Sequence, residues 1–305
     1  MKVVLTLLMF LFCQPALALT IATGTPEGTY YQIAQDIKQI AEKEGIPVEI
    51  IHTNGSFDNI NLLGLEKVDL AILQLDVLKV TSDAMQAKAG FNVLKEIKVI
   101  LNLYFEEIHV ITKNDGIRSL SQLEGKKVAV GPDRSGSALT AEVLLTAYDL
   151  RVEKFFDAPN DALQKLERGE LDALIFVGGA PVPAFEKLDP SFRFVRLPSN
   201  PILEQLYQRK RIDKGVYPWA GEVETFAVPS AIMTRDRRDS EYVTLIQRLL
   251  LTILSNKEKL DAIGHPKWKT AQFRFMIPSV AYPPSNDVIL IYNILDAYGY
   301  GIIKK

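Results

Sequence analysis

Two glycine-containing loops, residues 24–29 and 131–137, carry residue types suited to binding an anion. Each follows a short apolar segment and runs into a helical pattern, with Thr29 at the first helix start and Ser135 and Ser137 at the second. A helix N-terminus offers backbone N–H groups without intrahelical partners and the positive end of the helix dipole. We therefore expect the two loops to bind one small carboxylate, provided that they face a common cleft.

Simpler roles remain open for the same loops. The glycines could only relieve backbone strain in tight turns, and the hydroxyls could only cap helices, a contribution of about 1 kcal/mol each. Dinucleotide binding does not fit, because Gly24 and Gly28 are separated by three residues and do not form the G-x-G-x-x-G pattern. A P-loop does not fit either, since no lysine follows Gly28 in the required place.

Catalytic and metal-binding patterns are missing from the sequence. The three histidines, His52, His109 and His265, lie far apart and none has the spacing of a metal-ligand pair. The segment around Ser135 and Ser137 lacks the flanking glycines of a nucleophile elbow. We expect no bound metal, no cofactor and no hydrolase site.

Composition narrows the function further. The 305 residues are 48% hydrophobic and 24% charged, a balance typical of a globular protein with a buried core. Lysine and arginine number 35 against 37 acidic residues, so the formal net charge is -2. Nucleic acid is not expected as a partner, because no basic excess exists to neutralise a phosphate backbone.

The N-terminus has the features of a secretory signal peptide. Lys2 precedes an apolar run over residues 3–12, and Ala16 and Ala18 form a small-x-small cleavage pattern. We predict a signal peptide at residues 1–18, cleavage before Leu19 and a periplasmic location.

Two other interpretations of this segment are weaker. A membrane anchor needs about 20 apolar residues, and the run is shorter and is followed by Pro15. A lipoprotein would use Cys13, but the bulky Phe12 precedes it where a small residue is expected. Cys13 is the only cysteine, so the mature chain would contain neither disulfides nor thiolate metal sites.

Hydrophobic periodicity predicts an α/β protein. A unit of strand, small-residue loop and helix at residues 19–41 recurs about a hundred residues later, as two similarly built lobes would produce. The predicted strands are residues 19–22, 48–52, 68–73, 99–104, 108–112, 126–130, 171–177, 192–197 and 225–233. The predicted helices are residues 33–41, 60–65, 119–125, 138–148, 162–168, 240–254 and 289–298.

The chain is expected to cross between the lobes twice. A proline within residues 225–233 suits a bend where the chain returns to the first lobe. We predict lobe I at residues 20–107 and 226–305 and lobe II at residues 108–225, joined by a hinge.

Several short motifs occur in the order in which one known family has them. They are Gly24-Thr25 with Gly28-Thr29-Tyr30-Tyr31, residues 125–132 with Ser135-Gly136-Ser137, Leu171-Asp172-Ala173 with Gly178-Gly179-Ala180-Pro181-Val182-Pro183, Tyr217-Pro218, and residues 225–228. Through these motifs the chain resembles the TAXI family of TRAP transporter solute-binding proteins, from Ile21 to about Met233.

This resemblance implies a fold, a function and partners. The fold would be the type 2 periplasmic-binding-protein fold, with two α/β lobes, a hinge and a ligand cleft between them. The protein would be a monomer that captures a small carboxylate or amino acid, glutamate-like in size, and delivers it to the membrane subunits of a TRAP permease driven by a sodium gradient. It would catalyse no reaction.

The resemblance also implies a set of ligand contacts, transferred by matching position. They are Thr25, Gly28, Thr29, Tyr30, Ser56, Gln74, Ser135, Gly136, Ser137, Gly178, Gly179, Pro181 and Tyr217. Two charged residues depart from the family pattern: Glu27 and Arg134 stand where the family usually has small, uncharged residues. Either both side chains point to solvent, or Glu27 binds a ligand amine and Arg134 a ligand carboxylate, which would favour amino acids.

Two rival functions stay open on the same scaffold. One is an enzyme, for which Glu27 is the best acid or base candidate, although no partner for it is evident. The other is a ligand sensor that presents its closed form to a signalling receptor instead of a permease.

Overall fold

A computed structural model describes residues 18–90, 96–236 and 239–271. The strands are β1 (Leu19–Ala22), β2 (Val48–Ile51), β3 (Leu70–Gln74), β4 (Ile97–Thr112), β5 (Lys127–Ala129), β6 (Glu153–Phe155), β7 (Ala173–Gly178), β8 (Arg193–Phe194), β9 (Gln208–Ile212) and β10 (Val223–Arg235). The α-helices are α1 (Thr29–Lys43), α2 (Ser56–Gly64), α3 (Leu75–Ala89), α5 (Gly136–Ala147), α6 (Pro159–Glu167), α7 (Leu203–Leu206), α8 (Ser240–Ser255) and α9 (Lys257–Ile263). Short 3₁₀ helices are η1 (Leu120–Leu123), η2 (Pro183–Phe185) and η3 (Pro266–Thr270).

Two predictions concern residues outside the described part of the chain. These are the signal peptide, of which only residue 18 is described, and the helix expected at residues 289–298. Within the described part of the chain, no helix combines the length and apolarity needed to cross a membrane.

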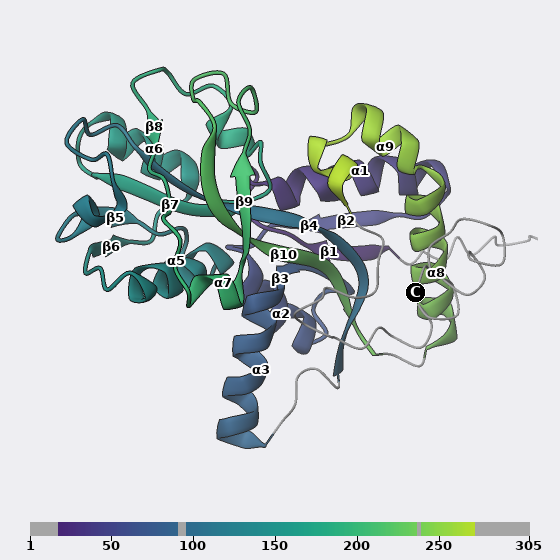
Figure 1. The fold of residues 1–305 in the computed structure, drawn as a ribbon. Coiled ribbons are helices and arrows are strands. Elements are labelled where there is room, and N and C mark those ends of the chain that lie inside the picture. The colour runs from purple at the N-terminus through teal and green to yellow at the C-terminus, as the bar shows by residue number, and fades with distance from the viewer. Residues whose placement is uncertain (1–17, 91–95, 237–238, 272–305) are drawn as a thin grey trace, which may run out of the picture.

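One hydrogen-bonded sheet runs through the molecule in the order β2-β1-β3-β10-β4-β7-β5-β6, with β8 paired to β4 and β9 to β10. At one end β1 pairs in parallel with β2 and β3, and at the other β5 pairs in parallel with β6 and β7. The two long strands between them, β4 and β10, are antiparallel to each other and to their outer neighbours. The result is two α/β lobes joined by a pair of strands (Figure 1).

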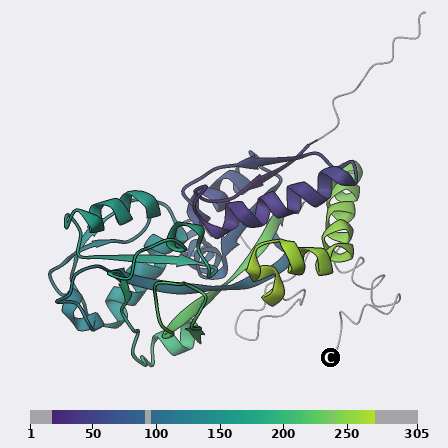
Figure 2. The same cartoon turned by 90° about the horizontal axis from the view of Figure 1, so that it is seen from above.

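The connection between the lobes is β4 together with β10, which both run from one lobe into the other (Figure 2). The prediction of separate strands at residues 99–104 and 108–112 was wrong, because β4 is continuous from Ile97 to Thr112. Residues 105–107 stay extended since β10 pairs along them, with Pro229 opposite Phe105. Beside this proline the register shifts, so the crossing coincides with an irregularity in β10.

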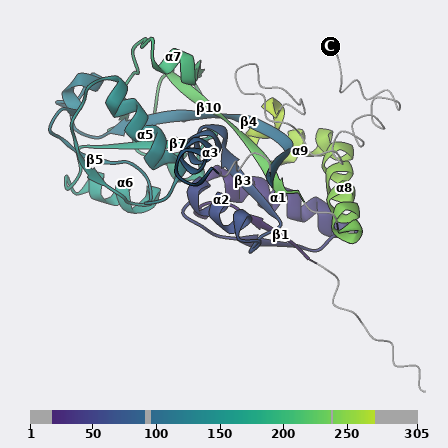
Figure 3. The ribbon, with the colours of Figure 1, turned by 90° about the horizontal axis from the view of Figure 1, so that it is seen from below.

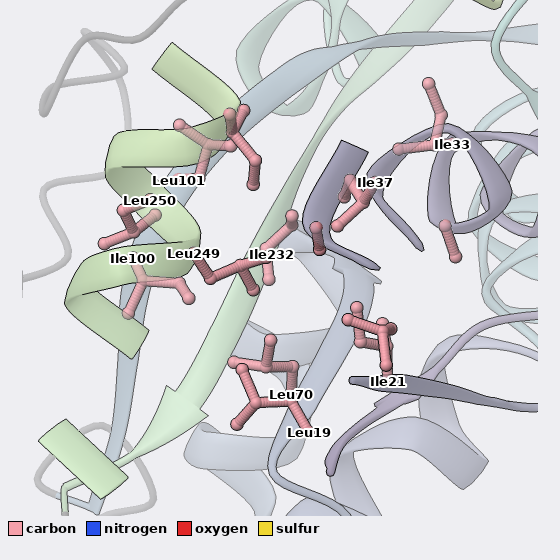
Figure 4. Close-up of a cluster of buried hydrophobic side chains, with 14 of the residues drawn as sticks. Leu19, Ile21, Ile33, Ile37, Leu70, Ile100, Leu101, Ile232, Leu249 and Leu250 are labelled. Atoms are coloured by element: carbon pink, nitrogen blue, oxygen red, sulfur yellow. The ribbon is translucent and has the colours of Figure 1, made fainter. Parts of the chain in front are cut away.

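The core of lobe I lies between the sheet and helices on both of its faces. Ile33 and Ile37 of helix α1 lie on the same face of the helix, because they are four residues apart. This apolar face packs over β1 and β3. Helix α8 adds Leu249 and Leu250 against Ile232 of β10 (Figure 4). On the opposite face α2 and α3 cover a second cluster that includes Leu63 and Leu78.

Lobe II repeats this layering. Helix α5 covers one face of β5 and β7, and α6 covers the other, where an aromatic group forms around Phe185 and Trp219. The expected recurrence of strand, loop and helix is therefore present, as β1 with α1 and β5 with α5. Helix α3 and strand β9 were not predicted, and the strand expected at residues 192–197 shortens to Arg193–Phe194.

Candidate ligand-binding cleft

A cavity lies between the lobes at the carboxyl ends of the strands, with an empty volume of about 450 Å³ that includes solvent at its mouth. Seen from below, α2 and α3 of lobe I lie beside α5 of lobe II (Figure 3). The predicted ligand contacts that line this cavity are Thr25, Gly28, Thr29, Tyr30, Ser56, Gln74, Ser135, Gly136, Ser137 and Gly178. The two loops identified in the sequence thus face one another, although binding by these residues stays a prediction.

Three helices begin at the cavity wall: α1 at Thr29, α2 at Ser56 and α5 at Gly136. The residues before α1 and α2 are the glycines Gly28 and Gly55, so no side chain caps these two helices. Their first N–H groups, with the positive ends of three helix dipoles, make this part of the cavity suited to a carboxylate.

Most hydroxyls of the predicted set already have protein partners. Ser135 Oγ accepts a hydrogen bond from the backbone N of Ala138 (3.1 Å), as an N-cap does. Ser137 Oγ donates to the backbone O of Val177 (3.3 Å) and accepts from its N (3.0 Å), tying α5 to β7. Ser56 Oγ accepts from the backbone N of Gln74 (3.1 Å).

The lobes touch across the cleft. Thr29 Oγ1, in lobe I, donates to the carbonyl of Gly179 in lobe II (2.8 Å). Asp76 Oδ2, at the start of α3, accepts from Thr140 Oγ1 and Tyr207 Oη of lobe II, both at 3.0 Å. Burial raises the pKa of Asp76 to about 6, while these hydroxyl donors act to lower it. The structure is therefore a closed arrangement of the two lobes.

Three predicted contacts do not line the cavity. Gly179 accepts the Thr29 bond, and the carbonyl of Pro181 lies 2.9 Å from His265 Nε2, so both lie where the lobes meet. Tyr217 is 1% exposed within lobe II, where its hydroxyl bonds to His109 Nε2 and accepts from the backbone N of Val182 (both 2.8 Å).

Glu27 and Arg134, the two charged residues that depart from the family pattern, are also not among the residues that line the cavity. Arg134 is exposed and its Nε donates to Asp58 Oδ1 of lobe I (2.5 Å). Glu27 approaches lobe II through its backbone, whose carbonyl accepts from the N of Ala184 (3.3 Å). One oxygen of the Glu27 carboxyl is buried without a hydrogen-bond partner.

Glu106 is the lining residue that sequence reasoning missed. It lies in β4 where the strand crosses between lobes, and it is 1% exposed. Its Oε2 accepts from Gln74 Nε2 (3.1 Å), while its Oε1 has no hydrogen-bond partner. Burial raises the pKa of Glu106 to about 8, and the negative charge of Asp76 adds to the rise.

A signal for Glu106 exists in the sequence. Two adjacent glutamates interrupt an apolar, β-branched stretch at residues 97–112. Neighbouring strand residues point to opposite faces, so Glu106 reaches the cavity while Glu107 forms an ion pair with Lys267 Nζ of η3 (2.5 Å). Carboxylates inside a buried strand need a partner or a ligand.

The histidines do not come together. His109 lies in the core of lobe II, where burial lowers its pKa to about 3. His265 is the N-cap residue of η3. The ring of His52 is tilted against that of Tyr31, with 4.8 Å between the ring centroids. In the described part of the chain no group of three or more His, Cys, Asp or Glu side chains is arranged to hold a metal ion.

Comparison with known proteins places this architecture in a family. The NMT1-like family matches residues 21–276, most of the chain. The protein belongs to the NMT1-like family.

Three solved structures are similar to this chain. A structure of a periplasmic transporter is similar to this member of the NMT1-like family, with a TM-score of 0.58, 12% identity, and coverage of 94% of this chain and 95% of the other. The GluR0 ligand-binding core from Nostoc punctiforme in complex with L-glutamate matches with a TM-score of 0.47 and 19% identity over 80% of this chain and 98% of that one. An ancestral arginine-binding protein bound to arginine matches with a TM-score of 0.49 and 23% identity over 80% and 96%. The fold is the two-lobe periplasmic-binding-protein fold.

Proposed function

We propose that this NMT1-like protein is a periplasmic solute-binding protein that captures a small carboxylate or amino acid, glutamate-like in size. The observation that carries the proposal is the cavity between the lobes, where α1, α2 and α5 all begin. Uncapped helix starts supply N–H donors for an acid group.

Capture would proceed by hinge closure. The lobes would separate about β4 and β10 near residues 107 and 226, dividing the chain into residues 20–107 with 226–305 and residues 108–225. The contacts of Thr29 with Gly179 and of Asp76 with Tyr207 would then form only on closure. Ligand binding would favour the closed state to the extent that it contacts both lobes.

Export and delivery complete the proposal. The N-terminal segment would be a signal peptide removed before Leu19, and the loaded monomer would deliver its solute to a TRAP-type permease, as the TAXI resemblance implies. N-terminal sequencing of periplasmic material should begin at Leu19. Recovery of a membrane-bound chain that retains Met1 would contradict the cleavage.

The protein would act without catalysis. The enzyme alternative relied on Glu27, which is not among the cavity-lining residues. The carboxyl that acts on Glu106 is that of Asp76, which accepts hydrogen bonds from Thr140 and Tyr207 and does not line the cavity either. An acid and a base held at different pKa values are the usual requirement for such chemistry.

Thermal-shift screening of protein purified from the periplasm, followed by calorimetry, tests capture. The panel consists of amino acids and of small mono- and dicarboxylates. A ligand at a hundred times its dissociation constant should stabilise the protein by ~2.7 kcal/mol. Scattering should show a smaller radius of gyration with that ligand, and no stabilisation by any panel member would refute the proposal.

Uptake measurements separate transport from sensing. Deleting the gene should abolish sodium-dependent uptake of the solute identified by calorimetry. Normal uptake in the deletion strain would favour the sensor.

A further inference from the structure

We propose that Glu106 selects the ligand by binding a protonated amine, so that the solute is an amino acid rather than an acid without an amine. This inference rests on the solute-binding function proposed above and names the class of solute for the same cavity.

The first support is a group of hydrogen-bond acceptors that the protein leaves unused. Glu106 Oε1 and Gln74 Oε1 have no hydrogen-bond partner, and both side chains line the cavity and are 1% exposed. The hydroxyl of Tyr30, on the cavity wall, also lacks a partner. Leaving buried polar atoms unpaired is unfavourable. An ammonium group, with three donors and no acceptor, matches such a group of oxygens.

The second support is the charge around Glu106. The groups that act on it come from five elements: Tyr30 on α1, Gln74 on β3, Asp76 on α3, Tyr104 on β4 and Ser230 on β10. All are neutral or acidic. The nearby cation Lys267 is paired with the neighbouring Glu107. A buried carboxylate is stabilised by an opposite charge, and at this site the ligand is the group left to supply it.

The third support is that the helix starts favour a negative group, whereas Glu106 favours a positive one. The first residues of α1, α2 and α5 line the same cavity and suit a carboxylate. A cavity with a carboxylate-binding end and an ammonium-binding residue matches a zwitterion. A dicarboxylate without an amine would offer no positive charge to Glu106 and would place its second negative charge near this side chain.

Proton linkage follows from this assignment. The pKa of Glu106 is raised to about 8 in the empty site, so the side chain is mostly protonated at pH 7. A bound ammonium lowers that pKa because it stabilises the carboxylate. Binding at pH 7 therefore releases up to about one proton, and affinity rises with pH until about pH 8.

Matched ligand pairs provide the test. Each amino acid that binds is compared by calorimetry with the acid in which hydrogen replaces the amine, for example L-glutamate with glutarate. It is also compared with the corresponding 2-oxo acid, for example 2-oxoglutarate. The amine-containing member should bind about 10- to 100-fold more tightly, the range for hydrogen bonds to a charged group. Calorimetry in buffers of different ionisation enthalpy should show proton release at pH 7.

Variants assign the effect to Glu106. Glu106→Gln keeps the shape and removes the charge, so affinity for the amino acid should fall about 10- to 100-fold and proton release should disappear. Glu49→Gln is the matched control, since Glu49 is exposed on β2 and does not line the cavity, and it should bind as the wild type does. Circular dichroism and thermal melting verify that both variants are folded.

The outcomes separate this inference from the proposed function. Equal affinity for the amine-free acid, proton uptake on binding, or wild-type affinity in Glu106→Gln would overturn the role of Glu106 while solute binding stands. Absence of binding to every member of the panel would refute both.

Discussion

The side-chain amide of Gln74 lies against Gly136 across the cleft, with its Oε1 1.6 Å from the position that a Cβ on Gly136 would occupy. Gln74 ends β3 in lobe I, and Gly136 is the first residue of α5 in lobe II. Ser56 Oγ would also lie within 2.9 Å of that Cβ. The absence of a side chain at Gly136 is therefore what allows the two lobes to come together at this point.

Gly136→Ala should weaken ligand binding more than it weakens the fold. The three atoms nearest to the added methyl group belong to Gln74 and Ser56 of lobe I, so the methyl group opposes closure of the lobes. We expect affinity for the bound amino acid to fall at least about 10-fold, measured by calorimetry. Scattering should show a radius of gyration that no longer falls on adding ligand.

Gly64→Ala, in α2, is the control for this variant. A Cβ there would meet no atom within 4 Å, and alanine is the better helix former by up to ~1 kcal/mol. Affinity should stay at the wild-type value. If Gly136→Ala also binds normally, the close approach to Gln74 is not needed for capture.

Thr29 and Ser135 should respond differently to loss of their hydroxyls. Ser135 caps α5, so Ser135→Ala should lower the free energy of unfolding by roughly 1 kcal/mol and leave affinity unchanged. Thr29 bridges the lobes to Gly179, so Thr29→Val should reduce affinity about 2- to 10-fold through loss of one closure contact.

Thr29→Ser keeps the bridging hydroxyl and should bind nearly as the wild type does. Urea unfolding and calorimetry measure the two effects separately. A large loss of affinity in Ser135→Ala would instead mean that this hydroxyl contacts the ligand directly.

Ionisation of Glu106 should make the ligand-free protein less stable as the pH rises from 6.5 to 8. Its folded pKa of about 8 lies above the usual glutamate value, so ionisation favours the unfolded chain between those two values. Ionisation of Asp76 also lowers the free energy of unfolding as the pH rises, but only up to about pH 6. His109, with its pKa lowered to about 3, acts only below about pH 6.5, where protonation favours unfolding.

The expected loss over this window is roughly 1 to 2 kcal/mol, measured by urea unfolding at constant ionic strength. Glu106→Gln should remove most of the pH dependence. Glu49→Gln, at an exposed position on β2, should keep it. If the free energy of unfolding of Glu106→Gln depends on pH as that of the wild type does, other groups titrate between pH 6.5 and 8.

Arg134→Ala should change affinity by no more than about threefold. Its guanidinium is exposed and pairs with Asp58 across the lobes rather than lining the cavity, and exposed ion pairs contribute little. Calorimetry at low and high salt measures the difference. A loss of affinity of tenfold or more, specific to acids, would support the alternative that Arg134 binds the ligand carboxylate directly.

Local patterns in the sequence were sufficient for the α/β class and the recurrence of strand, loop and helix. Hydrophobic periodicity located β1 and α8, and small residues at helix starts located the loops of Thr29 and Gly136, because these signals depend on neighbours along the chain. Residues such as Tyr217 were placed only by resemblance, and the structure puts Tyr217 in the core of lobe II.

Glu106 and the closing contacts depended on tertiary structure. A strand pattern does not distinguish a buried carboxylate from an exposed one, and Glu106 becomes a candidate ligand contact only because β4 crosses between the lobes beside Gln74 and Tyr30. Likewise, Gly136 faces a glutamine 62 positions earlier in the sequence. The sequence by itself determined the α/β class and the two strand–loop–helix units that carry the predicted binding loops. Packing of distant segments decided which polar atoms lack a partner, since burial and charge depend on neighbours in space.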